Sequence, residues 1–86
     1  MKITRTARFK KAWQELTEEE KALGRKALRN LAKDLRYPAL RVRKIQAVEH
    51  IWEARVSRSL RMTFELEQDT IILRNIGRHD ETLGRP

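Results

Sequence analysis

The spacing of apolar residues changes once along the chain, and this change limits the fold more than any other feature. From 7 to 35 the apolar residues recur mostly at intervals of three and four, as in a helix that buries one face. From 60 to 67 apolar and polar residues alternate, as in a strand with one buried face. Tyr37-Pro38 separates the two zones, because the residue before a proline avoids helical angles. The chain is therefore expected to form helices first and a sheet afterwards.

The helical zone is expected to be a hairpin of two helices. Thr17 begins the second arm, and Thr17 with Glu20 has the spacing of a capping box, in which each residue satisfies a backbone amide of the other. The second arm runs to about Leu35. Gly24 lies inside it and costs about 1 kcal/mol relative to alanine. We expect this glycine to allow close packing of the two arms.

The remaining segments are expected to be strands joined by tight turns at 58–59 and 68–69. Gly77 is expected to end the last strand, and 78–86 to be a polar tail. Strand, helix, helix and meander in this order predict one α+β domain over 1–86, with the helices on one face of a mainly antiparallel sheet. The expected strands are Lys2 to Arg5, Val42 to Ile45, Ile51 to Ser57, Leu60 to Glu67 and Thr70 to Ile76. The side chains expected to be largely buried are Ile3, Phe9, Trp13, Leu23, Leu31, Ile45, Val56, Met62, Phe64 and Ile72.

Composition excludes several classes of site. The chain has 86 residues and no cysteine, which excludes a disulfide framework and a thiolate metal site. Apolar residues make up 40% of the chain, enough for one core but not for an enclosed cavity as well, so an active site should be an open groove. No long apolar run is present, and the short charged start is not expected to be a signal peptide, so the expected location is the cytoplasm.

The net charge of +8 points to anionic partners. It comes from 20 Lys plus Arg against 12 Asp plus Glu. Arginine predominates among the cations, and its planar fork of donors suits phosphate groups. Such a surplus favours polyanions through steering and counterion release. The alternative is a basic protein that binds no nucleic acid.

The cations are densest between 36 and 61, which contains seven Lys or Arg and two acids. Arg55 and Arg61 flank the expected turn, so the two cations should meet across neighbouring strands. Like charges at opposite positions are destabilising unless an anion binds between them, which predicts a phosphate site. The alternative is a solvated sheet face with dispersed cations. The predicted phosphate- or RNA-binding residues are Arg41, Arg43, Lys44, Arg55 and Arg58, around a central Arg61.

His79-Asp80 follows the expected last strand. A histidine beside a carboxylate suits a general acid or base near neutral pH, with Asp80 orienting the ring. The alternative is an exposed loop histidine without a role. His79 and His50, the two histidines of the chain, do not have metal-ligand spacing, so neither a metal nor another cofactor is expected.

The segment from Ile51 to Phe64, IWEARVSRSLRMTF, resembles the central motif of the RelE/ParE superfamily of toxins from type II toxin–antitoxin systems. That motif has an aromatic residue, an arginine, a short turn, and a second arginine that opens a strand with an aromatic three residues later. The order of elements extends the resemblance to essentially the whole chain. It implies a compact α+β fold, an acidic antitoxin partner and, most often, ribosome-dependent cleavage of mRNA.

The resemblance also implies roles for individual residues. Arg61 matches the strand arginine that holds the scissile phosphate, and His79 matches the C-terminal catalytic histidine of the YoeB-like branch. The positions 41–44 match a basic pair of the RelE branch. The chain departs from the YoeB-like pattern at these positions, where a carboxylate base is usual. It also departs from the family at Asp80, where a catalytic tyrosine is common, and it continues for six residues beyond.

The expected function is therefore a toxin that cleaves mRNA on the ribosome, with DNA contacted only through the antitoxin. In this reaction the 2′-OH of the RNA attacks the adjacent phosphate without a metal ion. Two other functions remain open. One is a ParE-like inhibitor of gyrase, and the other is a module of the same fold that binds nucleic acid without cutting it.

Overall fold

A five-stranded sheet forms the centre of the computed structural model, which describes residues 1–46 and 48–86. The strand order is β1-β5-β4-β3-β2. β1 is parallel to β5, and all other neighbours are antiparallel, as expected for an α+β fold with a mainly antiparallel sheet. The strands are β1 (Lys2–Arg5), β2 (Arg43–Lys44), β3 (Trp52–Arg55), β4 (Leu60–Glu67) and β5 (Thr70–Arg78).

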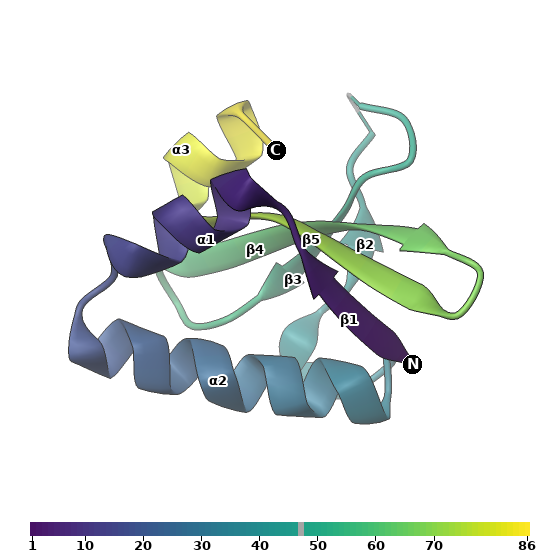
Figure 1. The fold of residues 1–86 in the computed structure, drawn as a ribbon, viewed down its shortest axis with the longest axis horizontal. Helices are drawn as coiled ribbons and strands as arrows, with labels where there is room; N and C mark the ends of the chain where they lie inside the picture. The colour runs from purple at the N-terminus through teal and green to yellow at the C-terminus, as the bar shows by residue number, and fades with distance from the viewer. Residues whose placement is uncertain (47) are drawn as a thin grey trace.

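The predicted helical hairpin consists of α1 (Ala7–Gln14) and α2 (Glu18–Lys33). Its capping box is confirmed. The Thr17 amide donates to Oε1 of Glu20 at 2.8 Å, and the Glu20 amide donates to the Thr17 hydroxyl at 3.1 Å. A 3-10 turn, η1 (Pro38–Leu40), leads from α2 towards β2. In Figure 1, α2 runs along one side of the sheet and α1 lies beside β5.

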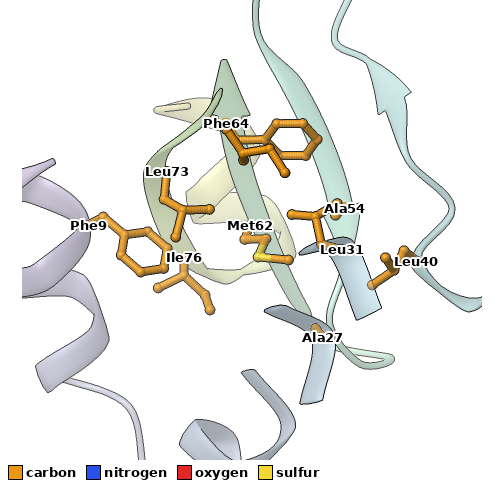
Figure 2. Close-up of a cluster of buried hydrophobic side chains, with 10 residues drawn as sticks. Phe9, Ala27, Leu31, Leu40, Ala54, Met62, Phe64, Leu73 and Ile76 are labelled. Carbon is orange, nitrogen blue, oxygen red and sulfur yellow. The ribbon is translucent and has the colours of Figure 1, made fainter. Parts of the chain in front are cut away.

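The core lies between the hairpin and one face of the sheet. Met62 and Phe64 of β4 point into it with Leu31 of α2 and Phe9 of α1, as the alternation predicts (Figure 2). The Phe9 and Trp13 rings stack with their centroids 6.1 Å apart. The buried cluster consists of Phe9, Ala27, Leu31, Leu40, Ala54, Met62, Phe64, Ile71, Leu73 and Ile76.

Several side chains that were predicted to be largely buried are exposed or only partly buried in the structure. Leu23 is 42% exposed, so its predicted burial is wrong, because it lies outside the stripe of α2 that faces the sheet. Ile72 is half-buried because it alternates with Ile71 and Leu73, which take the core side of β5. Ile45 is half-buried as well. Ile3, Trp13 and Val56 pack partly buried against the core cluster.

The segment 78–86 is not the polar tail that the sequence predicts. β5 continues through Gly77 to Arg78, and a further helix, α3 (His79–Gly84), follows. A Cβ atom at Gly77 would lie 2.8 Å from the hydroxyl of the buried Thr82, so α3 packs directly on this glycine. Gly77 is paired with Arg61, whose side chain alternates with the core residue Met62. Therefore α3 lies on the sheet face opposite α2, and Figure 1 shows the two helices on opposite sides of the sheet. We call this second face the outer face; its residues include Arg43, Glu53, Arg55, Arg61, Thr63, Asn75 and Gly77.

Candidate functional site

The turn between β3 and β4 brings the two predicted arginines together. Arg55 and Arg61 are directly opposite in the strand register, which confirms the expected pairing. Nη1 of Arg61 donates to the carbonyl oxygens of Ser57 at 2.7 Å, Leu60 at 3.0 Å and Arg58 at 3.4 Å. Nε of Arg55 donates to the same Ser57 carbonyl at 3.4 Å. The backbone of the turn thus holds one guanidinium firmly and a second one beside it.

The arrangement concentrates positive charge. Partial burial, and after it the neighbouring Arg55, lower the pKa of the Arg61 guanidinium from its ordinary value, whereas Glu53 acts in the opposite direction. Arginine stays protonated at physiological pH, so two cations remain side by side. A bound anion would relieve the repulsion between the two guanidinium groups, so the pair is suited to binding a phosphate.

A buried carboxylate lies next to these cations. Glu53 of β3 is opposite Arg43 of β2 on one side and opposite Thr63 of β4 on the other. Its side chain is only 7% exposed, and Oε1 accepts a hydrogen bond from Nε of Arg43. The Arg43 side chain is 71% exposed, so the acid is held from its solvent side by a cation. Burial of an acid is costly unless it is paired in this way.

Sequence reasoning counted Glu53 only as a charge and missed its position. The signal was present, because Glu53 and Arg55 are two residues apart in an expected strand and must share a face. Alternation alone does not tell that Arg43 covers the carboxylate, since that depends on the pairing of β2 with β3.

The other predicted cations are more dispersed. Arg41 has a left-handed backbone, with φ of +45°, and borders a shallow cleft of about 440 Å³ that Tyr37 and Trp52 also line. Lys44 is opposite Trp52, on the core side of the register, and so does not share the outer face. Arg58 is exposed in the turn. Of the predicted set, the structure gathers on the outer face only Arg43, Arg55 and Arg61.

His79 is anchored to the turn that carries the arginine pair. Its backbone amide donates to the Ser59 carbonyl at 2.9 Å, and it begins α3. Nδ1 of His79 lies 3.1 Å from Oδ1 of Asp80, so the two groups that the sequence analysis pairs are in contact. The imidazole is 46% exposed and the Asp80 side chain is fully exposed, so the ring is accessible to a large ligand.

The C-terminal segment occupies the adjoining part of the outer face. The Thr63 hydroxyl donates to the Pro86 carbonyl at 3.0 Å, and Nε of Arg74 donates to the same oxygen at 3.3 Å. Nδ2 of Asn75 donates to the Arg85 carbonyl at 3.0 Å. This segment therefore lies over β4 and β5, and the arginine pair lies beyond it, at the turn between β3 and β4.

A larger cleft than the one beside Arg41 lies elsewhere. It measures about 770 Å³ and lies between α1, α3 and the end of β5, without Arg55, Arg61 or His79 in its lining. Cations and acids both line it, so no single sign of charge dominates. Within the described ranges, no group of three or more His, Asp or Glu residues could hold a metal ion. No helix in the same part of the chain is long and apolar enough to span a membrane.

No protein-family model and no curated protein matches this chain. Solved structures do match. A chain of the RelB–RelE antitoxin–toxin complex from Methanococcus jannaschii is 16% identical with a TM-score of 0.74, and the match covers 90% of this chain and 91% of that one. A chain of the intact E. coli RelBE toxin–antitoxin complex is 15% identical with a TM-score of 0.72, covering 91% and 95%. The YoeB/ParE toxin from Agrobacterium tumefaciens is 13% identical with a TM-score of 0.75, covering 92% and 99%.

These matches establish the fold. Each aligns over at least 90% of this chain, so the whole arrangement of strands and helices is shared. The chain therefore has the fold of the RelE/ParE toxins, as the motif around the turn between β3 and β4 predicts. The candidate site of this chain combines an arginine pair, a covered carboxylate and a histidine anchored to the same turn.

Proposed function

We propose that this protein is the toxin of a toxin–antitoxin pair and that it cleaves mRNA on the ribosome. The observation that carries the proposal is the pairing of Arg55 with Arg61 beside the turn that anchors His79, on a fold of the RelE/ParE type. Ribosomes would place its action in the cytoplasm.

The proposed reaction needs no metal ion. The 2′-OH of a ribose attacks the adjacent phosphate, and the bond to the 5′ oxygen breaks. Arg61 stabilises the charge that develops on the phosphate oxygens, assisted by Arg55. His79 donates a proton to the leaving 5′ oxygen, and Asp80 orients the imidazole. Arg43 and Arg58, which flank the pair, contact the neighbouring phosphates. Arg41 and Lys44, which lie off the outer face near the sheet edge, contact phosphates further along the RNA strand.

The proposed protein partner is an acidic antitoxin, and DNA would be contacted only through it. Two of the similar solved structures are toxin–antitoxin complexes, and a surplus of eight positive charges favours an acidic partner. Binding of such a partner should weaken as salt rises, because exposed charges are screened beyond about 8 Å at physiological ionic strength.

The test is cleavage of mRNA by the purified protein on purified ribosomes, read by primer extension. Arg61→Ala and His79→Ala should each slow cleavage, and Arg61→Lys should not restore the full rate, because a point charge lacks the arginine fork. His79→Ala should also remove the pH dependence that an imidazole confers. Both variants should stay folded by circular dichroism. His79→Ala should change the stability by no more than about 0.5 kcal/mol, as at ordinary surface positions, whereas Arg61→Ala also removes hydrogen bonds to the carbonyls of the turn and should lower it by about 1–3 kcal/mol.

Arg25→Ala is the matched control, since Arg25 is an exposed arginine of α2 on the other side of the sheet. Folded Arg61→Ala and His79→Ala proteins that cut as fast as the parent would place the active site elsewhere. A parent that never cuts but blocks DNA supercoiling would support the gyrase alternative. A parent that does neither would be a binding module, an alternative that the exposed Asp80 at the tyrosine position favours.

A further inference from the structure

The proposed reaction leaves one chemical role without a residue. A phosphate needs a cation and the leaving oxygen needs an acid, which Arg61 and His79 supply, but the attacking 2′-OH must also lose a proton. A positioned base typically contributes about 10²- to 10⁴-fold to such a step. The base must lie on the outer face, within reach of a ribose whose phosphate is bound by the arginine pair.

We propose that Glu53 is this base, an inference that rests on the proposed function. Glu53 shares the outer face with Arg55, two residues along β3, and is diagonally opposite Arg61 of β4. Diagonal neighbours in an antiparallel pair lie about 7–8 Å apart at the backbone, which long side chains and a nucleotide between them can span. A ribose attached to a phosphate on the arginine pair can therefore reach this carboxylate.

The carboxylate has one oxygen fixed and the other available. Oε1 accepts the hydrogen bond from Nε of Arg43, which sets the orientation of the group. Within the described part of the chain, Oε2 has no hydrogen-bond partner, yet no buried side-chain oxygen or nitrogen there is unsatisfied. The Glu53 side chain keeps 7% of its surface exposed, and Oε2, the oxygen without a partner among the described residues, can accept a proton.

A second acid of the same two strands has a different environment. Glu65 of β4 is four residues from Arg61, and its carboxylate lies 3.3 Å from Nη1 of Arg74 and is 35% exposed. It is opposite Ile72 of β5, four residues further along β4 than Arg61, which lies next to the turn. Glu65 is therefore the natural comparison for Glu53, with the same chemistry and no access to the arginine pair.

The step balances as a transesterification. The 2′-OH gives its proton to Oε2 of Glu53 while the 2′ oxygen bonds to phosphorus. The bond from phosphorus to the 5′ oxygen breaks, and that oxygen takes the proton from the His79 imidazolium. The products are a 2′,3′-cyclic phosphate and a 5′-hydroxyl, and Glu53 then returns its proton to water.

The competing role for Glu53 is structural, as an anchor for Arg43. The two roles predict different results for matched variants. If Glu53 is the base, Glu53→Gln should lower the single-turnover cleavage rate by about 10²- to 10⁴-fold, with RNA binding retained, because the amide still accepts from Arg43 but takes no proton. Arg43→Gln, whose amide can still donate to the carboxylate, loses one phosphate contact and should lower the rate less than Glu53→Gln does. If Glu53 is only an anchor, Arg43→Gln should be at least as slow as Glu53→Gln.

The experiment measures cleavage of ribosome-bound mRNA from acidic to neutral pH for the parent, Glu53→Gln, Glu53→Asp, Arg43→Gln and Glu65→Gln. The parent and Glu65→Gln should lose rate towards acidic pH with the same profile, and Glu53→Gln should lose that dependence. Glu53→Asp should be slower than the parent but keep the acidic decline, and it decides the matter if the glutamine variant does not fold. An mRNA with sulfur as the 5′ leaving atom should rescue His79→Ala, since sulfur leaves without an acid, but should not rescue Glu53→Gln.

The activity of the parent protein distinguishes a failure of the role proposed for Glu53 from a failure of the proposed function. Suppose that the parent cuts, and that folded Glu53→Gln cuts within threefold of the parent rate or keeps the acidic decline. This result would overturn the role of Glu53 and leave the proposed function intact. A parent that never cuts overturns the proposed function, and the role of Glu53 with it.

Discussion

Gly24 shows how one residue sets the distance between the two helices of the hairpin. A Cβ atom at this position would lie 2.6 Å from Cζ3 and 2.8 Å from Cη2 of Trp13. Distances this short are not tolerated by packed atoms, so the Trp13 ring or the helix would have to move. The ring is itself stacked on Phe9 of the core, which restricts that movement. The sequence-based expectation of close packing at this glycine is therefore confirmed.

Gly24→Ala should destabilise the protein even though alanine is the better helix former. The propensity gain is about 1 kcal/mol, and overpacking typically costs about 1–3 kcal/mol. We expect the free energy of unfolding to fall by up to about 2 kcal/mol, measured by urea denaturation. Gly84→Ala is the control, since a Cβ atom there meets nothing within 4 Å, and it should be neutral or slightly stabilising. An increase in stability for Gly24→Ala would show that the ring yields easily.

At the same scale, the sequence identified part of the candidate site and missed part of it. Arg55 and Arg61 were predicted to face each other because a tight turn between two alternating segments fixes the register locally. Glu53 was missed because its burial depends on Arg43, which reaches it from a two-residue strand at the sheet edge. A strand of two residues has almost no periodic pattern, so the strand with which it pairs cannot be predicted from the sequence.

Elements with strong local signals were predicted closely. β4 has the predicted bounds, Leu60 to Glu67, and α2 begins after the predicted cap at Thr17. Neither α3 nor the extension of β5 was predicted. Gly77 was interpreted as the end of a strand, but its missing side chain instead makes room for Thr82 of α3. That contact joins two segments through packing, which a reading of local pattern does not detect.

Two leucines of α2, one buried and one exposed, test which side of this helix packs against the sheet. Leu31 is fully buried in the core, so Leu31→Ala should lower the free energy of unfolding by about 2–5 kcal/mol. Leu23 is exposed, so Leu23→Ala should change it by no more than about 0.5 kcal/mol. Both changes remove the same atoms from the same helix, and chemical denaturation compares them directly. Equal losses would mean that α2 faces the sheet with a different side.

Across the whole molecule, positive charge is not confined to the candidate site. The exposed side of α2 carries Arg25, Lys26 and Arg29, while the outer face and its turn carry Arg43, Arg55, Arg58 and Arg61. Net charge alone therefore does not say which side a polyanion binds. The two sides differ in how their cations are arranged. On the outer face the strand register places Arg55 directly opposite Arg61, whereas α2 has its cations spread along the helix surface, with acids at its start.

This difference predicts which cations set the salt dependence of RNA binding. Each phosphate contact on a single strand contributes about 0.7 to the slope of log affinity against log salt. The double variant Arg55→Gln and Arg58→Gln should therefore reduce the slope by about 1.4 and weaken binding. The double variant Arg25→Gln and Lys26→Gln removes the same charge from α2 and should leave the slope unchanged. A short single-stranded RNA with 2′-O-methyl groups, which cannot be cleaved, reports binding by fluorescence anisotropy between low and high salt. Equal loss of slope in the two double variants would mean that RNA is attracted by net charge and does not select the outer face.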